Sequence, residues 1–233
     1  VPTHTHSTDK DLGTLGKELM RQMMHLSGPD HWTPMPDGQN DALVQLAPAS
    51  HEFKDALRHF RKSVNKSVLK IERVQNRYLW MRYLQRKMVL LSKNGKAGLN
   101  ERVLFHGTRA TPPAKIWDGL NACGFDPRLG SGYYGVGAYF AERAEYSTKG
   151  YEYKGLGGNF RQIFLATVLT GEEKDFGTTI KRALKRAPDL PPNHPRAPGL
   201  YDSVKGGPHG GSFMYIIYQS DQAYPLYLYT YRD

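Results

Sequence analysis

Apolar residues in the first part of the chain recur at intervals of three and four positions, the spacing of a helix that buries one face. We expect residues 1–30 to form a tail or a loosely packed amphipathic helix, whose apolar positions are Leu12, Leu15, Leu19, Met23 and Leu26. Two surface helices are predicted next, with apolar faces formed by Phe53, Ala56, Leu57, Phe60 and Val64 and by Leu79, Trp80, Tyr83, Leu84 and Met88. The second should end near Gly95, and residues 68–74 between the two helices are predicted to form a strand.

The second half of the chain has a different pattern: short apolar runs bounded by Gly, Pro and polar residues, which is typical of strands. The predicted strands are Val103–Phe105, Ala138–Ala141, Gln162–Leu169, Leu200–Val204, Met214–Tyr218 and Leu226–Tyr231. One helix should begin at Thr111-Pro112 and close at Gly124. Since the connectors hold only short helices, we expect an α+β fold with a small helical N-terminal part and a mostly antiparallel, strand-rich core.

The connector 171–199 contains five prolines and is too long for a plain turn, which indicates a functional loop. A dinucleotide fingerprint, Gly130-x-Gly132-x-x-Gly135, precedes a strand-like run and not a helix. We therefore reject a Rossmann site, because that motif needs a helix N-terminus to receive the pyrophosphate. The glycines instead allow a loop to pass close to a ligand.

Composition narrows the class of protein. The chain has 233 residues and a formal net charge of +10, which attracts phosphates on nucleic acid, membranes or small ligands unless it only solubilises the surface. The one cysteine excludes an intrachain disulfide, and no apolar run approaches about 18 residues. We expect an intracellular monomeric domain, cytoplasmic or nuclear, without membrane contact. No metal is expected, because the nine histidines lack ligand spacing.

Two short segments carry candidate chemistry. His106-Gly107-Thr108 ends an apolar strand, so the Gly107 backbone could hold a carboxamide while His106 and Thr108 reach hydroxyls; a structural histidine is the alternative. Tyr139 and Tyr151 could stack on a flat heteroaromatic ring with the Ser147 hydroxyl on its amide, although they could also be ordinary core aromatics.

Taken together, these segments resemble the catalytic domain of the poly(ADP-ribose) polymerase family, the diphtheria-toxin-like ADP-ribosyltransferases. The resemblance extends over residues 31–233, and its nearest likeness is to the mono-ADP-ribosylating branch whose larger members carry macrodomains. Its further landmarks are His31-Trp32, the run from Lys70 to Asn76 with Tyr78-Leu79-Trp80, Leu200–Val204 and Asp221–Pro225. It implies the ADP-ribosyltransferase fold with split sheets, and NAD⁺ as co-substrate.

The resemblance also implies residue roles. His106 would bind a ribose hydroxyl, the Gly107 backbone and Ser147 would bind the nicotinamide amide, and Tyr139 and Tyr151 would pack on its ring. Thr108 adds to the NAD⁺ site. Tyr153 is a rival to Tyr151, and Arg128 in the donor loop 125–134 could meet phosphate or remain solvated.

The third catalytic position is Met214, where chain-forming members carry a glutamate. A carboxylate there would stabilise positive charge on the ribose and activate a hydroxyl for elongation, and methionine does neither. We therefore expect a transferase that uses His106, Tyr139 and Met214 to attach one ADP-ribose to a protein acceptor, including itself, with release of nicotinamide. The alternatives are an inactive NAD⁺- or ADP-ribose-binding module and a transferase acting on nucleic-acid ends, which the sequence does not favour.

Overall fold

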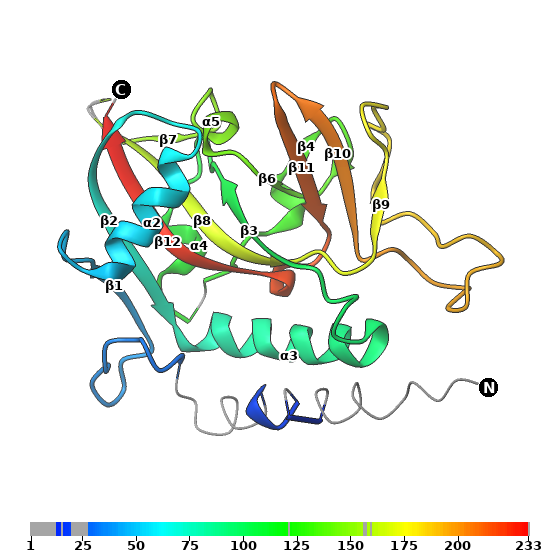
Figure 1. The fold of residues 1–233 in the computed structure, drawn as a ribbon, viewed down its shortest axis with the longest axis horizontal. Helices are drawn as coiled ribbons and strands as arrows, with labels where there is room; N and C mark the ends of the chain where they lie inside the picture. Colours follow the sequence, from blue (N-terminus) through cyan, green and yellow to red (C-terminus); the bar gives the residue numbers. More distant parts are fainter. Residues whose placement is uncertain are drawn as a thin grey trace.

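Strands dominate the structure, a computed structural model that describes residues 13–14, 16–19, 28–120, 122–155, 158 and 160–232 (Figure 1). Within those residues one sheet of ten strands has the order β1-β2-β12-β8-β3-β6-β11-β10-β9, and β7 pairs with β8 beside this path. Every pair is antiparallel except β9 with β10. The strands are β1 (Asp41–Gln45), β2 (Ser67–Asn76), β3 (Glu101–His106), β6 (Ala138–Ala141), β7 (Tyr153–Lys154), β8 (Arg161–Leu169), β9 (Glu173–Asp175), β10 (Ser203–His209), β11 (Ser212–Ile217) and β12 (Ala223–Arg232).

The sheet has a seam between β3 and β6. One residue pair, Phe105 with Ala141, joins these two strands, whereas β3 and β8 are paired along the whole of β3. The seam divides the sheet into a larger part ending at β3 and a smaller part starting at β6. This division agrees with the mostly antiparallel, split-sheet fold expected from the sequence.

Two longer helices pack against the larger part of the sheet, one over β2 and β12 and the other below the strands in the view of Figure 1. Helix α2 (His51–Arg61) begins at Ser50, whose side chain accepts a hydrogen bond from the Phe53 N–H, and its Phe60 stacks on Tyr229 of β12 at 5.4 Å. Helix α3 (Arg77–Asn94) follows β2 directly, and Gly95 closes it with a φ of 71°. Both helices agree with the apolar periodicity of the sequence.

Shorter elements shape the region around the seam. They are the helices α4 (Ala114–Trp117) and α5 (Ala144–Ser147), the 3-10 turns η1 (Pro127–Leu129) and η2 (Ser220–Gln222), and the hairpin of β4 (Ser131–Gly132) with β5 (Gly135–Val136). Gly132 and Gly135 of the fingerprint therefore lie in a hairpin that is followed by strand β6 and not by a helix, as expected from the rejection of a Rossmann site.

Some sequence-based expectations were wrong in extent. The helix expected from Thr111 to Gly124 is the single turn α4, because the backbone leaves the helical region at Asp118 and turns through Gly119 at a φ of 76°. The strand expected over 200–204 starts at Ser203 and continues to His209. Strand β1 and the short strands β4, β5, β7 and β9 were not predicted.

The N-terminal stripe can be assessed in part. Residues 13–14 and 16–19 are helical, and Leu19 is buried with Leu79 and Leu84 of α3. Leu12, Leu15, Met23 and Leu26 lie outside the described residues.

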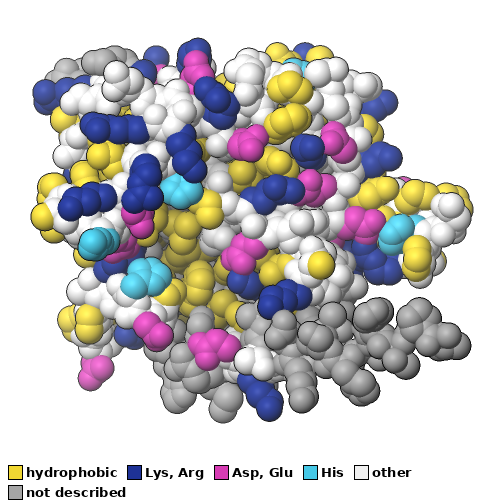
Figure 2. All heavy atoms as spheres, viewed as in Figure 1, with side chains coloured by type: hydrophobic (Ala, Val, Ile, Leu, Met, Phe, Trp, Pro, Cys, Tyr) yellow, Lys and Arg dark blue, Asp and Glu magenta, His cyan; other side chains and the backbone are white. Residues whose placement is uncertain are grey.

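Charged residues are mixed over the face seen in Figure 2, where Asp and Glu side chains lie among the Lys and Arg side chains. Many of them form ion pairs, such as Arg86 with Asp221 at 3.0 Å and Lys93 with Asp202 at 2.6 Å, which fasten α3 to later parts of the chain. Among the helices described, none is long and apolar enough to cross a membrane.

Candidate functional site

A cavity of about 650 Å³ lies at the seam of the sheet. Its wall comes from the end of β3, the donor loop before β6, strand β6 itself, α5 and one residue of β11. Seven of the eight candidate residues line it: His106, Gly107, Thr108, Tyr139, Ser147, Tyr151 and Met214. The fold therefore brings together residues that are separated by more than half of the described sequence.

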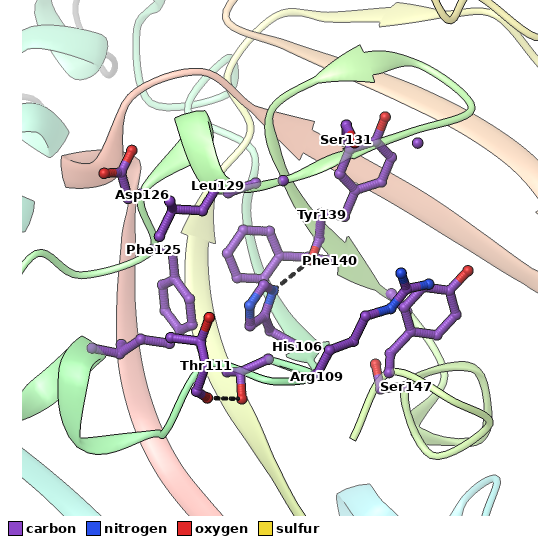
Figure 3. A pocket seen from close by; sticks show the side chains of 18 of the residues that line it. His106, Arg109, Thr111, Phe125, Asp126, Leu129, Ser131, Tyr139, Phe140 and Ser147 are labelled. Atoms are coloured by element: carbon purple, nitrogen blue, oxygen red, sulfur yellow. Dashed lines mark hydrogen bonds between the residues drawn. The ribbon is translucent and has the colours of Figure 1, made fainter. Parts of the chain in front are cut away.

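His106 is the last residue of β3, and its ring stands at the centre of the close view in Figure 3. Its Nδ1 lies 2.7 Å from the Tyr139 carbonyl oxygen, which can only accept, so Nδ1 carries the proton and donates it. The ring packs edge-on against Phe125 at 4.8 Å. Burial lowers the pKa of His106 to about 4. The imidazole is therefore neutral at pH 7, with Nε2 as an acceptor for a hydroxyl.

Gly107 is required by a close approach of two backbones. A Cβ at this position would lie 2.2 Å from the Tyr151 carbonyl oxygen, and that same oxygen accepts a hydrogen bond from the Arg109 N–H at 2.9 Å. Thr108 uses its hydroxyl hydrogen locally, because it donates to the Thr111 carbonyl oxygen at 2.7 Å. Any side chain at Gly107 would therefore separate the β3 end from the segment that carries Tyr151.

Tyr139 joins the cavity wall to the β4–β5 hairpin. Its hydroxyl donates to the Gly135 carbonyl oxygen at 2.7 Å and accepts from the Tyr134 N–H at 3.0 Å. Burial raises the pKa of Tyr139 to about 12, so the phenol is protonated at neutral pH. The residue therefore positions the hairpin over the cavity.

The ring stacked on Tyr151 is Tyr146 of α5, a residue that the sequence reasoning missed. The two ring centroids are 5.2 Å apart with an interplanar angle of 18°, and the hydroxyl oxygens are 3.3 Å apart. Ser147 follows Tyr146 on α5 and is buried in the wall. Tyr153 lies on β7 and is not part of the wall, so of the two rivals Tyr151 is the one that faces the cavity.

Arg128 is the candidate residue that the structure leaves out of the cavity. Its side chain is 86% exposed and bonds to Asp126 two residues earlier, with Arg128 Nη2 2.7 Å from Asp126 Oδ2. The basic residues of the described wall are Arg109, Lys115 and Arg182. The Arg109 guanidinium lies 4.4 Å from the centre of the Tyr151 ring, and that of Arg182 lies 5.0 Å from Tyr133. The sequence offered one signal for Arg109, its position directly after His106-Gly107-Thr108.

Met214 lies in β11, paired with Ala141 of β6 and with Gly206 of β10. It is 3% exposed and packs in an apolar cluster with Tyr134, Val204 and Ile216. Among the described residues that line the cavity, Asp126 has the one carboxylate, and Arg128 pairs with it. The position that could have held a catalytic carboxylate therefore contributes only apolar contact.

The wall can recognise several parts of one ligand. Aromatic rings suit a flat ring, the neutral His106 suits a hydroxyl, and three cations suit phosphates. No group of His, Cys, Asp or Glu in the described part of the chain is arranged to hold a metal ion.

Comparison with known proteins agrees with this geometry. The family model for the poly(ADP-ribose) polymerase catalytic domain matches residues 50–233. Human "Protein mono-ADP-ribosyltransferase PARP14" is 32% identical over 208 residues, which are 88% of this chain and 11% of that protein. A Dictyostelium discoideum "Probable poly [ADP-ribose] polymerase" is 32% identical over 82% of this chain and 52% of its own length. Mouse "Protein mono-ADP-ribosyltransferase PARP12" is 31% identical over 87% of this chain and 27% of its own length. The chain therefore spans about half or less of each of these relatives.

Proposed function

The chain belongs to the poly(ADP-ribose) polymerase catalytic domain family, whose members are NAD⁺-dependent ADP-ribosyltransferases, and we propose that it transfers a single ADP-ribose from NAD⁺ to a protein acceptor, itself included, releasing nicotinamide. Relatives named as mono-ADP-ribosyltransferases support the single transfer.

In this proposal NAD⁺ enters the cavity by its nicotinamide end. The Gly107 backbone and the Ser147 hydroxyl bind the amide, and the ring packs beside Tyr151. His106 accepts a hydrogen bond from a ribose hydroxyl through Nε2, because its Nδ1 proton is already donated to Tyr139. Arg109, Lys115 and Arg182 are the cations available for the pyrophosphate, in place of Arg128.

The chemistry follows from the charge that moves during the reaction. The ribose C1′–N bond breaks, nicotinamide leaves as a neutral molecule with the bonding electron pair, and the ribose carbon gains positive character. An acceptor carboxylate can form the new C1′–O bond without losing a proton, so a single transfer needs no base. Elongation would use a ribose hydroxyl as nucleophile, which must lose a proton to a base.

The observation that carries the proposal is Met214, 3% exposed inside an apolar cluster at the wall. Methionine is at most a weak acceptor and cannot take a proton from a hydroxyl. Single transfer to an acceptor that brings its own nucleophile is therefore the reaction that these residues support best.

The test is to incubate the purified protein with labelled NAD⁺ and to measure intact mass and gel migration, with His106→Ala as the control. We expect discrete mass increments of one ADP-ribose that are absent from the control. A polymer ladder would contradict the interpretation of Met214. Measurable NAD⁺ binding without any label would favour a binding module over an enzyme.

A further inference from the structure

The segment 172–202, which follows β8, has an imbalance in its charge pairing. All five of its carboxylates already have a basic partner: Glu172 pairs with His194 and Arg196, Glu173 with Arg102, Asp175 with Lys205, Asp189 with Arg186, and Asp202 with Lys93. Four of its cations, Lys174, Lys181, Arg182 and Lys185, have no carboxylate partner among the described residues, and we call these four the basic strip. Three of the four are exposed.

Aromatic rings lie beneath three side chains of the basic strip, Lys174, Lys181 and Arg182. Lys174 Nζ lies 6.0 Å from the centre of the Phe176 ring and 5.5 Å from that of Tyr201, and Lys181 Nζ lies 5.7 Å from Phe176. A cation over a ring face is attracted to it, and this limits the conformations of a long side chain. The charges of the strip are therefore partly preorganised.

The basic strip is continuous with the cavity. Arg182 and the Tyr133 ring beneath it both line the wall. The backbone is fastened there as well, because the Lys181 N–H donates to the Tyr133 carbonyl oxygen at 2.7 Å and the Val136 N–H donates to the Leu184 carbonyl oxygen at 2.9 Å. A chain bound along the strip would thus reach the cavity at Arg182.

We propose that the basic strip is a docking surface for an acidic segment of the acceptor protein and guides that segment to the cavity at Arg182. This inference rests on the proposed function for its biological meaning, but the surface can be tested without NAD⁺. Four cations with no internal carboxylate partner complement a run of aspartate and glutamate. The proposal concerns the acidic residues that flank the modified residue, and the modified side chain itself can be of any type.

The ring contacts argue against single-stranded nucleic acid as the occupant. Bases bind such strips by stacking on open aromatic faces. Here Phe176 has Lys174 and Lys181 over it and lies nearly parallel to Tyr134 at 6.4 Å, while Tyr133 contacts Arg182 and His209. Because these rings already contact other side chains, a partner would bind the strip through its positive charges.

The experiment measures binding of a short fluorescein-labelled peptide of alternating glutamate and serine by fluorescence anisotropy, without NAD⁺ and at two ionic strengths. The test variant is Lys174→Gln/Lys181→Gln/Lys185→Gln, which leaves Arg182 and the cavity wall intact. The matched control is Lys54→Gln/Arg61→Gln/Lys62→Gln at helix α2, which removes the same charge from exposed positions. We expect peptide affinity to fall about tenfold in the test variant, to stay unchanged in the control, and to weaken with salt.

Three results would overturn the inference: equal loss in both variants, equal binding of a peptide with glutamine in place of glutamate, or an oligonucleotide that binds more tightly than the peptide and loses affinity in the test variant. The binding assay also separates the two proposals. If the protein transfers no ADP-ribose but still binds the peptide through the basic strip, the proposed function is contradicted and the docking surface is supported.

Discussion

His106, Tyr139 and Met214 lie in one cavity wall, but different contacts position them. His106 is oriented by the Tyr139 carbonyl oxygen, and the Tyr139 side chain in turn anchors the β4–β5 hairpin through Gly135. The Met214 side chain packs in an apolar cluster on strand β11. Removing the Tyr139 ring should thus displace the hairpin. The hydrogen bond from His106 should remain, because its acceptor is the backbone carbonyl oxygen of Tyr139.

A comparison of Tyr151 and Met214 tests their assignment. We expect Tyr151→Ala to weaken binding of a nicotinamide-site ligand such as 3-aminobenzamide by about tenfold or more, because the ring beside the ligand and its contacts with Tyr146 and Arg109 are lost. The matched control is Met214→Leu, which conserves volume and should cost less than about 1.5 kcal/mol of stability with little change in affinity. Isothermal titration calorimetry provides the measurement, and comparable losses of affinity in both variants would contradict the assignment.

At the scale of elements, several residues that carry the family resemblance support the structure and lie outside the cavity. Gln222 donates to the carbonyl oxygens of Leu169 at 3.0 Å and Asp202 at 2.9 Å, which ties the start of β12 to two other segments. The Tyr224 hydroxyl donates to the Val74 carbonyl oxygen and accepts from the Asn76 N–H, both at 3.0 Å. These contacts hold β2, β8 and β12 around the start of α3.

Asn76 links the start of α3 to other parts of the chain. Its side chain caps α3 by accepting from the Leu79 N–H at 3.0 Å, and its amide donates to the Trp117 carbonyl oxygen at 2.9 Å. We expect Asn76→Ala to lower the free energy of unfolding by about 2–3 kcal/mol, since a cap and a buried hydrogen bond are both lost. Ser50→Ala, a simple cap at α2, should cost about 1 kcal/mol. Urea denaturation checks both values, and equal costs would refute the second role of Asn76.

The whole molecule places its binding cavity where its sheet is least continuous. One residue pair joins β3 to β6, and the cavity opens beside that pair, lined from both parts of the sheet. A well-paired sheet covers its backbone, whereas a seam leaves room for a ligand between strand ends. The fold can therefore keep a large core and still expose main-chain groups at Gly107.

Three histidines whose pKa is lowered in the folded protein should make the stability of the molecule depend on pH. Burial lowers the pKa of His31, of His59 and, to about 4, of His106. Between about pH 6.5 and pH 4 the unfolded chain therefore binds protons that the folded chain does not, so stability is present above pH 6.5 and is lost as pH falls. His106 accounts for up to about 3 kcal/mol of this change.

Chemical denaturation at pH 7 and pH 4.5 measures this effect in the wild type and in His106→Gln. We expect the difference in unfolding free energy between the two pH values to be smaller in the variant. An identical pH dependence would mean that His106 titrates near its ordinary value.

Periodicity predicted most of the longer elements because it reflects local geometry. The stripe of Phe53, Phe60 and their neighbours gave α2, and the apolar run before Gly107 gave β3. The prediction from capping residues failed for Thr111–Gly124, where such residues surround a helix of one turn, because Asp118 and Gly119 redirect the chain. Capping signals mark where a helix can start and say little about its length.

The sequence by itself determined the family, the α+β order of the longer elements and seven of the residues in the cavity wall, because these follow from motifs and from local periodicity. Only the tertiary structure decided which other groups share that wall. Tyr146 of α5 stacks on Tyr151 five residues later, and Arg182 reaches the wall from a segment far along the chain. The Arg128 side chain lies outside the cavity, where it forms an ion pair with Asp126 two residues earlier. Which side chains contact one another depends on the groups that lie close together in the folded protein, and the spacing of residues along the chain does not predict this.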